Sequence, residues 1–258
     1  MKLGLKIWSI NHPSFIRLNE FYQKGYIDYV ELYTFPESFS QEHLAPLLDI
    51  PIILHAPTFP HGMNLAEPLV KIAGLLKDIQ QYIAFFKENK IIFHPGVMVN
   101  TMEESIEHTI LNLKKLKSEF DIILENVPAI GIDNKSLMVG ADPVDFKFIK
   151  DKTRVKSCLD FGHAINSANY RAIDPFVYIM EFLWQQPFMF HLSDGHFNSH
   201  IDVHLHYKEG TFPLKKLIKM IPNNGMLSLE TPKIDFKHLS EDLANLALIK
   251  KILDEGRR

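Results

Sequence analysis

The 258-residue sequence has little cysteine and little arginine: Cys158 is its only cysteine, and it holds five arginines. A single cysteine excludes an internal disulfide framework and is typical of a reducing compartment, so we expect a cytoplasmic location. No apolar run approaches the roughly 18 residues that span a bilayer, and the first residues lack a cleavable signal pattern. We therefore expect no membrane association.

The sequence also lacks an excess of positive charge. Its formal net charge is −3, so the molecule as a whole offers no broad cationic field to a polyanion. Hydrophobic residues make up 46% and charged residues 23%, which is typical of a globular protein with a sizeable core. Thirteen histidines are many for this length and are the first sign of metal chemistry.

Short apolar runs alternate with segments of helical periodicity along the whole chain. The eight expected strands are Leu3–Trp8, Ile27–Tyr33, Pro51–His55, Ile91–His94, Ile122–Glu125, Val155–Asp160, Phe188–His191 and Met226–Glu230. The expected helices are Ser14–Lys24, Gln41–Leu48, Leu65–Lys87, Met102–Ser118, Pro143–Lys150, Ile173–Trp184, Pro213–Met220 and Phe236–Leu253.

Eight strand–helix units in about 250 residues predict a (β/α)8 TIM barrel, an α/β fold, as a single domain over residues 1–258. An open doubly wound sheet would alternate in the same way, but no Gly-x-Gly-x-x-Gly turn follows the first strand. The longest stretch without a helical pattern is 193–212, and loops of that length are usually functional.

Polar side chains stand at the ends of six consecutive expected strands, from the third to the eighth. In a TIM barrel these ends open on the face where active sites are built. The residues are His55, His94, Glu125, Asp160, His191 and Glu230, and His163, Asp202 and His204 follow in the adjoining loops. Imidazoles and carboxylates without a thiolate suit divalent cations, with zinc first and manganese or iron as alternatives. Nine candidate ligands exceed the needs of one ion, so two to three are expected.

These residues lie in motifs that resemble the endonuclease IV family of apurinic/apyrimidinic endonucleases, within the xylose-isomerase-like TIM barrel superfamily. The motifs follow the family's order over nearly the whole chain. They are Leu54-His55, Phe93-His94-Pro95-Gly96, Leu124-Glu125-Asn126, Cys158-Leu159-Asp160-Phe161-Gly162-His163, His191-Leu192-Ser193-Asp194, Asp202-Val203-His204 and Leu229-Glu230-Thr231.

The resemblance implies a trinuclear metal centre that hydrolyses DNA phosphodiesters beside abasic sites. It implies that His55, His94 and Glu125 hold one ion. Glu125 would be shared with a second group that contains Asp160, His191 and Glu230, while His163, Asp202 and His204 would hold the third ion. As catalytic roles, Glu125 is expected to orient the nucleophile and Glu230 to accept its proton.

The loops around the expected centre match this family less well than the centre does. The segment Glu31-Leu32-Tyr33 resembles the sugar isomerase branch of the superfamily, and its loop carries no arginine. Phe59 is expected to be a core or lid residue. Asn64 and Lys208 are the candidate substrate contacts, the lysine because a phosphate needs a cation or an amide to bind it.

Two other functions remain open from the sequence. A metal-dependent sugar isomerase or epimerase would use one ion on Glu125, Asp160, His191 and Glu230, with a small sugar or sugar phosphate as its substrate. A barrel that only binds metal is the non-enzymatic alternative. No protein partner is evident.

Side chains close to the expected ligands have predicted supporting roles. Asn126 and Asp194 are expected to orient ligands, and Cys158 to be buried and inert. The histidines His196, His200 and His206 are expected to be exposed in the long loop.

Overall fold

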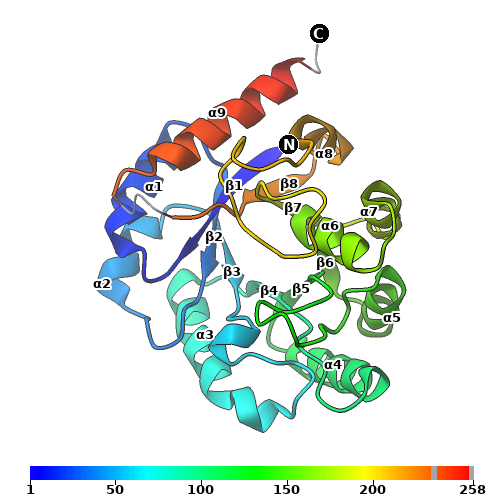
Figure 1. Ribbon diagram of the computed structural model, residues 1–258. Coiled ribbons are helices and arrows are strands. Elements are labelled where there is room, and N and C mark those ends of the chain that lie inside the picture. The colour runs from blue at the N-terminus through cyan, green and yellow to red at the C-terminus, as the bar shows by residue number, and fades with distance from the viewer. Residues whose placement is uncertain (234–236, 256–258) are drawn as a thin grey trace.

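In the computed structural model, which describes residues 1–233 and 237–255, the strands form one closed barrel surrounded by helices (Figure 1). Within these residues each strand pairs in parallel with its sequence neighbours, and the first also pairs with the last. The strands are β1 Lys2–Trp8, β2 Tyr29–Tyr33, β3 Ile52–His55, β4 Lys90–Phe93, β5 Asp121–Glu125, β6 Lys156–Asp160, β7 Met189–Leu192 and β8 Met226–Leu229. The predicted (β/α)8 TIM barrel is confirmed.

Helices follow the strands on the outside of the barrel. They are α1 Phe15–Gln23, α2 Gln41–Leu44, α3 Ala73–Phe86, α4 Met102–Leu116, α5 Pro143–Thr153, α6 Phe161–Tyr170, α7 Pro175–Leu183, α8 Leu214–Met220 and α9 Ser240–Glu255. Short 3-10 helices lie at His12–Ser14, Ala45–Leu47, Phe59–His61 and Leu69–Ile72. The long helix α9 lies beside α1 and α8 (Figure 1). No helix within the described ranges is long and apolar enough to cross a membrane.

The start of one expected helix was wrong, and one helix was missed. The third expected helix begins at Ala73 rather than Leu65, because Pro68 and a 3-10 turn precede it. Helix α6 was not predicted, because it begins directly after β6 with no intervening loop. The expected start of the last helix, Phe236, lies outside the described residues, and the helix begins at Ser240.

The barrel interior is filled by a layer of side chains from successive strands. Its members are Tyr29, Ile53, Ile92, Ile123, Cys158 and Met189. On β1 the corresponding residue is Gly4, where an added Cβ would lie 2.3 Å from the Tyr29 ring. Glycine therefore leaves the space that the tyrosine ring fills. Cys158 is buried in this layer, as expected, and burial raises the pKa of its thiol.

Candidate metal centre

Strand alternation places the candidate ligands directly above the interior layer. Side chains two positions apart on a strand point to the same side. Each strand that contributes to the interior layer has a polar or charged residue two positions further along. These residues are Glu31, His55, His94, Glu125, Asp160 and His191. The same spacing on the first and last strands leads from Gly4 to Lys6 and from Ser228 to Glu230. The site is thus the next layer of the barrel interior, at the carboxyl ends of the strands.

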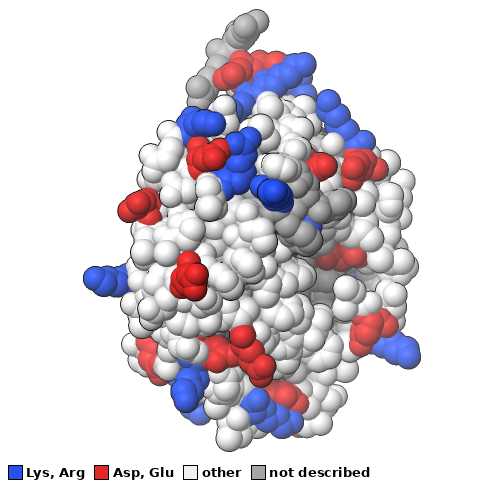
Figure 2. Space-filling view, turned by 90° about the vertical axis from the view of Figure 1, so that its left-hand side faces the viewer, with Lys and Arg blue, Asp and Glu red and all other residues white. Residues whose placement is uncertain are grey.

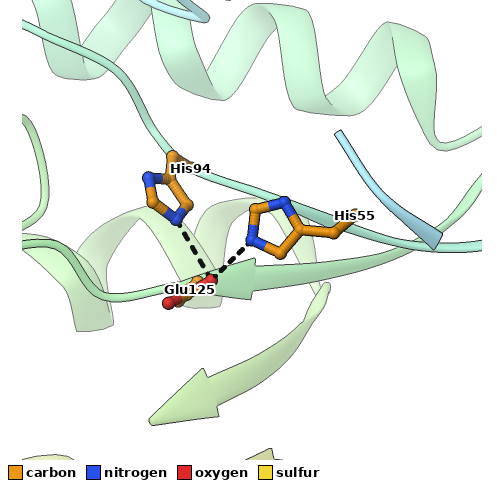
Figure 3. Close-up of side chains that lie close together, drawn as sticks. All are labelled: His55, His94 and Glu125. Carbon is orange, nitrogen blue, oxygen red and sulfur yellow. Dashed lines mark hydrogen bonds and ion pairs between the residues drawn. The ribbon is translucent and has the colours of Figure 1, made fainter. Parts of the chain in front are cut away.

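The first group consists of His55, His94 and Glu125, which converge from β3, β5 and the loop after β4. Each histidine places its Nε2 atom 3.1 Å from Glu125 Oε2 (Figure 3). His55 donates its Nδ1–H to the carbonyl of Ala56 at 2.7 Å, which leaves Nε2 unprotonated in the neutral ring. Metal-binding histidines commonly show this arrangement.

The second group shares Glu125 with the first and adds Asp160, His191 and Glu230. One oxygen or nitrogen from each residue lies within 4.8 Å of the others. His191 Nδ1 lies 3.0 Å from Glu125 Oε1 and 3.0 Å from Glu230 Oε2, but only the contact with Glu125 has hydrogen-bond geometry. Glu230 therefore has a buried oxygen without a hydrogen-bond partner. Asp160 also caps α6, since its Oδ1 accepts a hydrogen bond from His163 N at 2.7 Å.

The third group consists of His163, Asp202 and His204. Asp202 Oδ2 lies 3.5 Å from His163 Nε2 and 3.2 Å from His204 Nε2. Each histidine donates its Nδ1–H to a backbone carbonyl, His163 to Asn126 and His204 to Glu230, both at 2.8 Å. Both Nε2 atoms consequently face the Asp202 carboxylate.

Two charged residues of this layer, Lys6 and Glu31, were not among the predicted site residues. Glu31 is fully buried, and its Oε2 lies 2.7 Å from His191 Nε2, so it fixes the ring that faces Glu125. Lys6 Nζ lies 2.6 Å from Glu230 Oε1 and 3.6 Å from Glu31 Oε1. Strand alternation predicts both positions. Lys6 lies two residues after Gly4, and Glu31 lies two residues after Tyr29.

Neighbouring carboxylates control the protonation of the histidines in the third group. Burial alone would lower the pKa of His204, but the carboxylates of Asp202 and Glu230 outweigh it and raise this pKa to about 9. Burial also opposes the charge on His163, but Asp160 and Asp202 raise its pKa well above the usual value. His94 is the opposite case, since burial outweighs the attraction of Glu125 and lowers its pKa to about 4.

The donor set fits divalent cations. Five carboxylates lie in the site with the ammonium of Lys6; those of Glu31, Glu125 and Asp160 are buried, and those of Asp202 and Glu230 are partly exposed. Burial raises the pKa of Asp160 to about 6, with help from Glu230 and Glu125 and against the opposing effect of His163. Such an excess of buried negative charge needs compensation by protons or by cations. Three groups of hard oxygen and imidazole donors without a thiolate suit zinc, manganese or iron.

The two candidate substrate contacts differ in their burial and in the hydrogen bonds that they make. Asn64 is buried, and its side chain bonds the backbone of Ala66 and Val97, so it joins two loops instead of facing the site. Lys208 is exposed and does not line the cavity described below; its backbone N–H binds Asp194.

Of the two expected supporting residues, Asn126 bonds the backbone of a candidate ligand, whereas Asp194 bonds the backbone of the long loop. Asn126 exchanges two hydrogen bonds with the backbone of Asp160. Asp194 accepts four backbone N–H groups of the long loop, from Gly195, Lys208, Gly210 and Phe212. The prediction for His206 was wrong, because it is buried and its Nδ1 lies 3.0 Å from Asn245 Nδ2.

A cavity of about 760 Å³ opens above the three groups. The loop 193–212, drawn in yellow, lies over this end of the barrel beside β7 and β8 (Figure 1). Five of the nine candidate ligands line the cavity, namely His94, His163, Asp202, His204 and Glu230. His55, Glu125, Asp160 and His191 lie deeper and are almost fully buried. A ligand in the cavity would therefore meet His94, the third group and Glu230 first.

The fold and the site define a TIM barrel with a histidine- and carboxylate-rich centre at the carboxyl ends of its strands. The chain belongs to the xylose isomerase-like TIM barrel family, which it matches over residues 27–252. No curated protein sequence matches it at a significant level.

Solved structures with the same fold include an endonuclease and proteins described as epimerase-like or as a putative isomerase. One is endonuclease IV from Thermus thermophilus, with 21% identity, a TM-score of 0.72, and coverage of 99% of this chain and 100% of the other. A D-tagatose 3-epimerase-like protein has 17% identity, a TM-score of 0.72, and coverage of 98% and 97%. A putative xylose isomerase from Rhodospirillum rubrum has 14% identity, a TM-score of 0.73, and coverage of 97% and 99%. At these identities the similarity establishes the fold alone.

Proposed function

We propose that this protein is a metal-dependent phosphodiester hydrolase with a three-metal centre of the endonuclease IV type. The observation that carries the proposal is the division of nine donors into three groups, two of which share Glu125. An isomerase that works with one ion would have no use for His55, His94, Asp202 and His204. DNA with an abasic site is the substrate class implied by the sequence resemblance.

Each residue of the centre would have a definite part in hydrolysis. Divalent cations bound there would supply an activated water and stabilise negative charge on the phosphoryl oxygens. Glu230 lines the cavity and has an oxygen without a hydrogen bond, so it is placed to accept the proton of the attacking water. Glu125 is fully buried among imidazoles, so its part is to hold the centre together rather than to touch substrate. Lys6 would keep the Glu230 carboxylate in place.

Metal analysis and cleavage assays test the proposal together. We expect close to three divalent ions per chain after reconstitution, and cleavage of a duplex with one tetrahydrofuran abasic analogue, of bis(p-nitrophenyl) phosphate, or of both. Glu230→Gln should lower the rate at least about 100-fold, the range for a lost general base. If the fully metal-loaded protein hydrolyses no phosphodiester, the proposal is wrong.

A sugar isomerase or epimerase is the second candidate, favoured by one feature of the second group. Glu125, Asp160, His191 and Glu230 form a complete four-ligand set by themselves, with two glutamates for moving a proton beside a carbonyl. This function predicts one ion per chain and the interconversion of ketoses without any phosphodiester cleavage.

A further inference from the structure

Part of the cavity wall is apolar. It is built by Trp8 at the end of β1 and by the loops that follow β1, β3 and β5, which add Ile10, Phe59, Ile132 and Met138. Three of these side chains are unusually accessible for apolar groups: Trp8 is 40% exposed, Ile10 42% and Ile132 80%. Large exposed apolar side chains around a cavity mouth indicate a ligand with an apolar part that covers them.

Trp8 is held in place as an aromatic platform. Its ring centre lies 5.4 Å from that of Tyr33, and Phe35 stacks on it at 5.9 Å with an interplanar angle of 28°. The edge of His61 meets it at 6.0 Å. Tyr33 is itself fixed, because its hydroxyl accepts the Thr58 N–H at 2.9 Å. Packing of this kind presents a rigid flat surface to a ligand at little cost in conformational entropy.

The other side of the mouth is formed by a small hairpin after β5. Met138 N bonds Ala129 O at 3.1 Å, and Gly131 N bonds Ser136 O at 2.8 Å. The hairpin carries Ile132 and Met138 into the cavity lining, and Met138 packs in a cluster with Val97 to which Phe59 adds. The cavity volume of about 760 Å³ matches a single small molecule.

Both lysines that line the cavity are already paired. Lys6 is 6% exposed and contacts Glu230, while Lys233 is 8% exposed and contacts Asp242 at 3.1 Å. No arginine is among the described lining residues. Figure 2 shows one outer face, on which cationic side chains are scattered among acidic ones over a largely uncharged surface. A nucleic acid duplex is held mainly by cations on its phosphates, and the described lining residues offer no unpaired cation for this.

We propose that the substrate is a small phosphodiester with one aromatic or similarly flat apolar group, which packs against Trp8 and Ile132 while its phosphate faces the metal-binding groups. This inference rests on the proposed hydrolase function and narrows it. In the reaction, water adds to phosphorus and one P–O ester bond breaks. The proton of the water passes to Glu230 and then to the leaving oxygen, so the products are a phosphomonoester and an alcohol.

Two diesters with the same leaving group test the role of the apolar wall. Thymidine 5′-(methyl phosphate) carries a base, and dimethyl phosphate carries only methyl groups, so methanol is the leaving group of both. We expect the metal-loaded protein to prefer the first in kcat/KM by at least about tenfold, the scale of one base stacked on an aromatic side chain. Trp8→Ala should reduce this ratio about tenfold, mainly through KM, and Trp8→Phe should restore most of it.

The matched control is Trp184→Ala, which removes the other tryptophan. Trp184 is 73% exposed, directly after α7, and should leave the ratio unchanged. The Trp184→Phe variant keeps Trp8 as the single tryptophan, so its fluorescence reports binding without turnover. Thymidine 5′-phosphate should quench this fluorescence at concentrations where methyl phosphate does not.

Three results separate this inference from the function on which it rests. Equal kcat/KM for the two diesters, with no quenching by the nucleotide, would overturn the inference and leave the hydrolase function standing. Faster cleavage of the abasic duplex than of the thymidine ester would also overturn it. Failure to hydrolyse any phosphodiester with all metals loaded would reject the hydrolase function itself.

Discussion

The ammonium nitrogen of Lys6 lies 2.6 Å from Oε1 of Glu230, although the two residues are 224 positions apart in the chain. Lys6 is on β1 and Glu230 follows β8, so the ion pair spans the join between the first and last strands of the barrel. Lys6 also faces the buried Glu31. One lysine therefore stabilises two carboxylates of the site.

Lys6→Met should destabilise the metal-free protein by about 3 to 5 kcal/mol, because it leaves buried carboxylates without their cation. Urea denaturation with and without metal measures this, and the loss should be smaller when bound cations compensate. Lys147→Met, which removes an exposed pair with Asp151, is the control and should change little. An equal small effect for both variants would show that Lys6 does not balance the buried charge.

Substitution of a candidate metal-binding residue should lower the metal content by a whole number of ions per chain. Glu125→Ala affects two groups and should remove two ions, whereas His204→Ala affects only the third group and should remove one. Mass spectrometric metal analysis after dialysis gives the counts. His12→Ala is the control, since His12 is exposed and stacks on His43 with ring centres 3.9 Å apart. Loss of the same number of ions from both ligand variants would contradict the division into groups.

Metal binding should release protons, because a metal takes neutral imidazole. With a pKa of about 9, His204 is protonated at pH 7 in the metal-free protein, so metal affinity should rise with pH up to about 9. Calorimetry in buffers of different ionisation enthalpy counts the protons. The raised pKa also means that His204 stabilises the metal-free fold below pH 6.5, its ordinary pKa, and that this contribution is lost as the pH rises through about 9. A metal affinity independent of pH between 6 and 9 would contradict this assignment.

Glu31→Gln should weaken metal binding about 10- to 100-fold at the group that contains His191, the usual effect of losing the carboxylate that orients a ligand histidine. The amide keeps the size but not the charge that faces His191 Nε2 at 2.7 Å. Competition with a chromophoric chelator measures the affinities. His163 belongs to another group, so binding at the third group should stay close to the native value.

Asp194→Asn should loosen the long loop, because an amide cannot accept all the N–H groups that the carboxylate accepts. We expect a loss of about 2 to 3 kcal/mol, the cost of leaving buried donors without partners, together with weaker metal binding at Asp202 and His204. The rate of limited proteolysis within 193–212 measures how readily the loop opens. Asp133→Asn changes an exposed carboxylate that also binds neighbouring N–H groups and should change neither property. Unchanged protease resistance in Asp194→Asn would refute this role.

The sequence predicted the barrel and the location of the candidate ligands because both depend on strand alternation. A strand of apolar residues that ends in His55 or Glu125 can be recognised without knowing its neighbours. Lys6 and Glu31 were missed because each lies inside an apolar run, and their partners come from other strands. The start of α6 was missed for a related reason, since Asp160 serves at once as strand end, helix cap and candidate ligand.

The loop contacts could not be predicted at all. Asn64 looked available for a substrate, yet its amide lies where Gly96 leaves room, and a Cβ added to that glycine would lie 2.0 Å from Asn64 Oδ1. Such a match between two distant loops follows from their folded paths and has no signature in either segment alone. The apolar cavity wall is similar, because Trp8 and Ile132 line the same cavity only in the closed barrel.

The order in which the strands supply the candidate ligands has a consequence for the folding of the chain during synthesis. The chain delivers its candidate ligands one strand at a time, and the last of them is Glu230. Until that residue has left the ribosome, the second group lacks a member and Lys6 lacks its closest partner. On the proposed function, a nascent chain would therefore collect only part of its metal, and the full complement would mark a molecule whose barrel has closed.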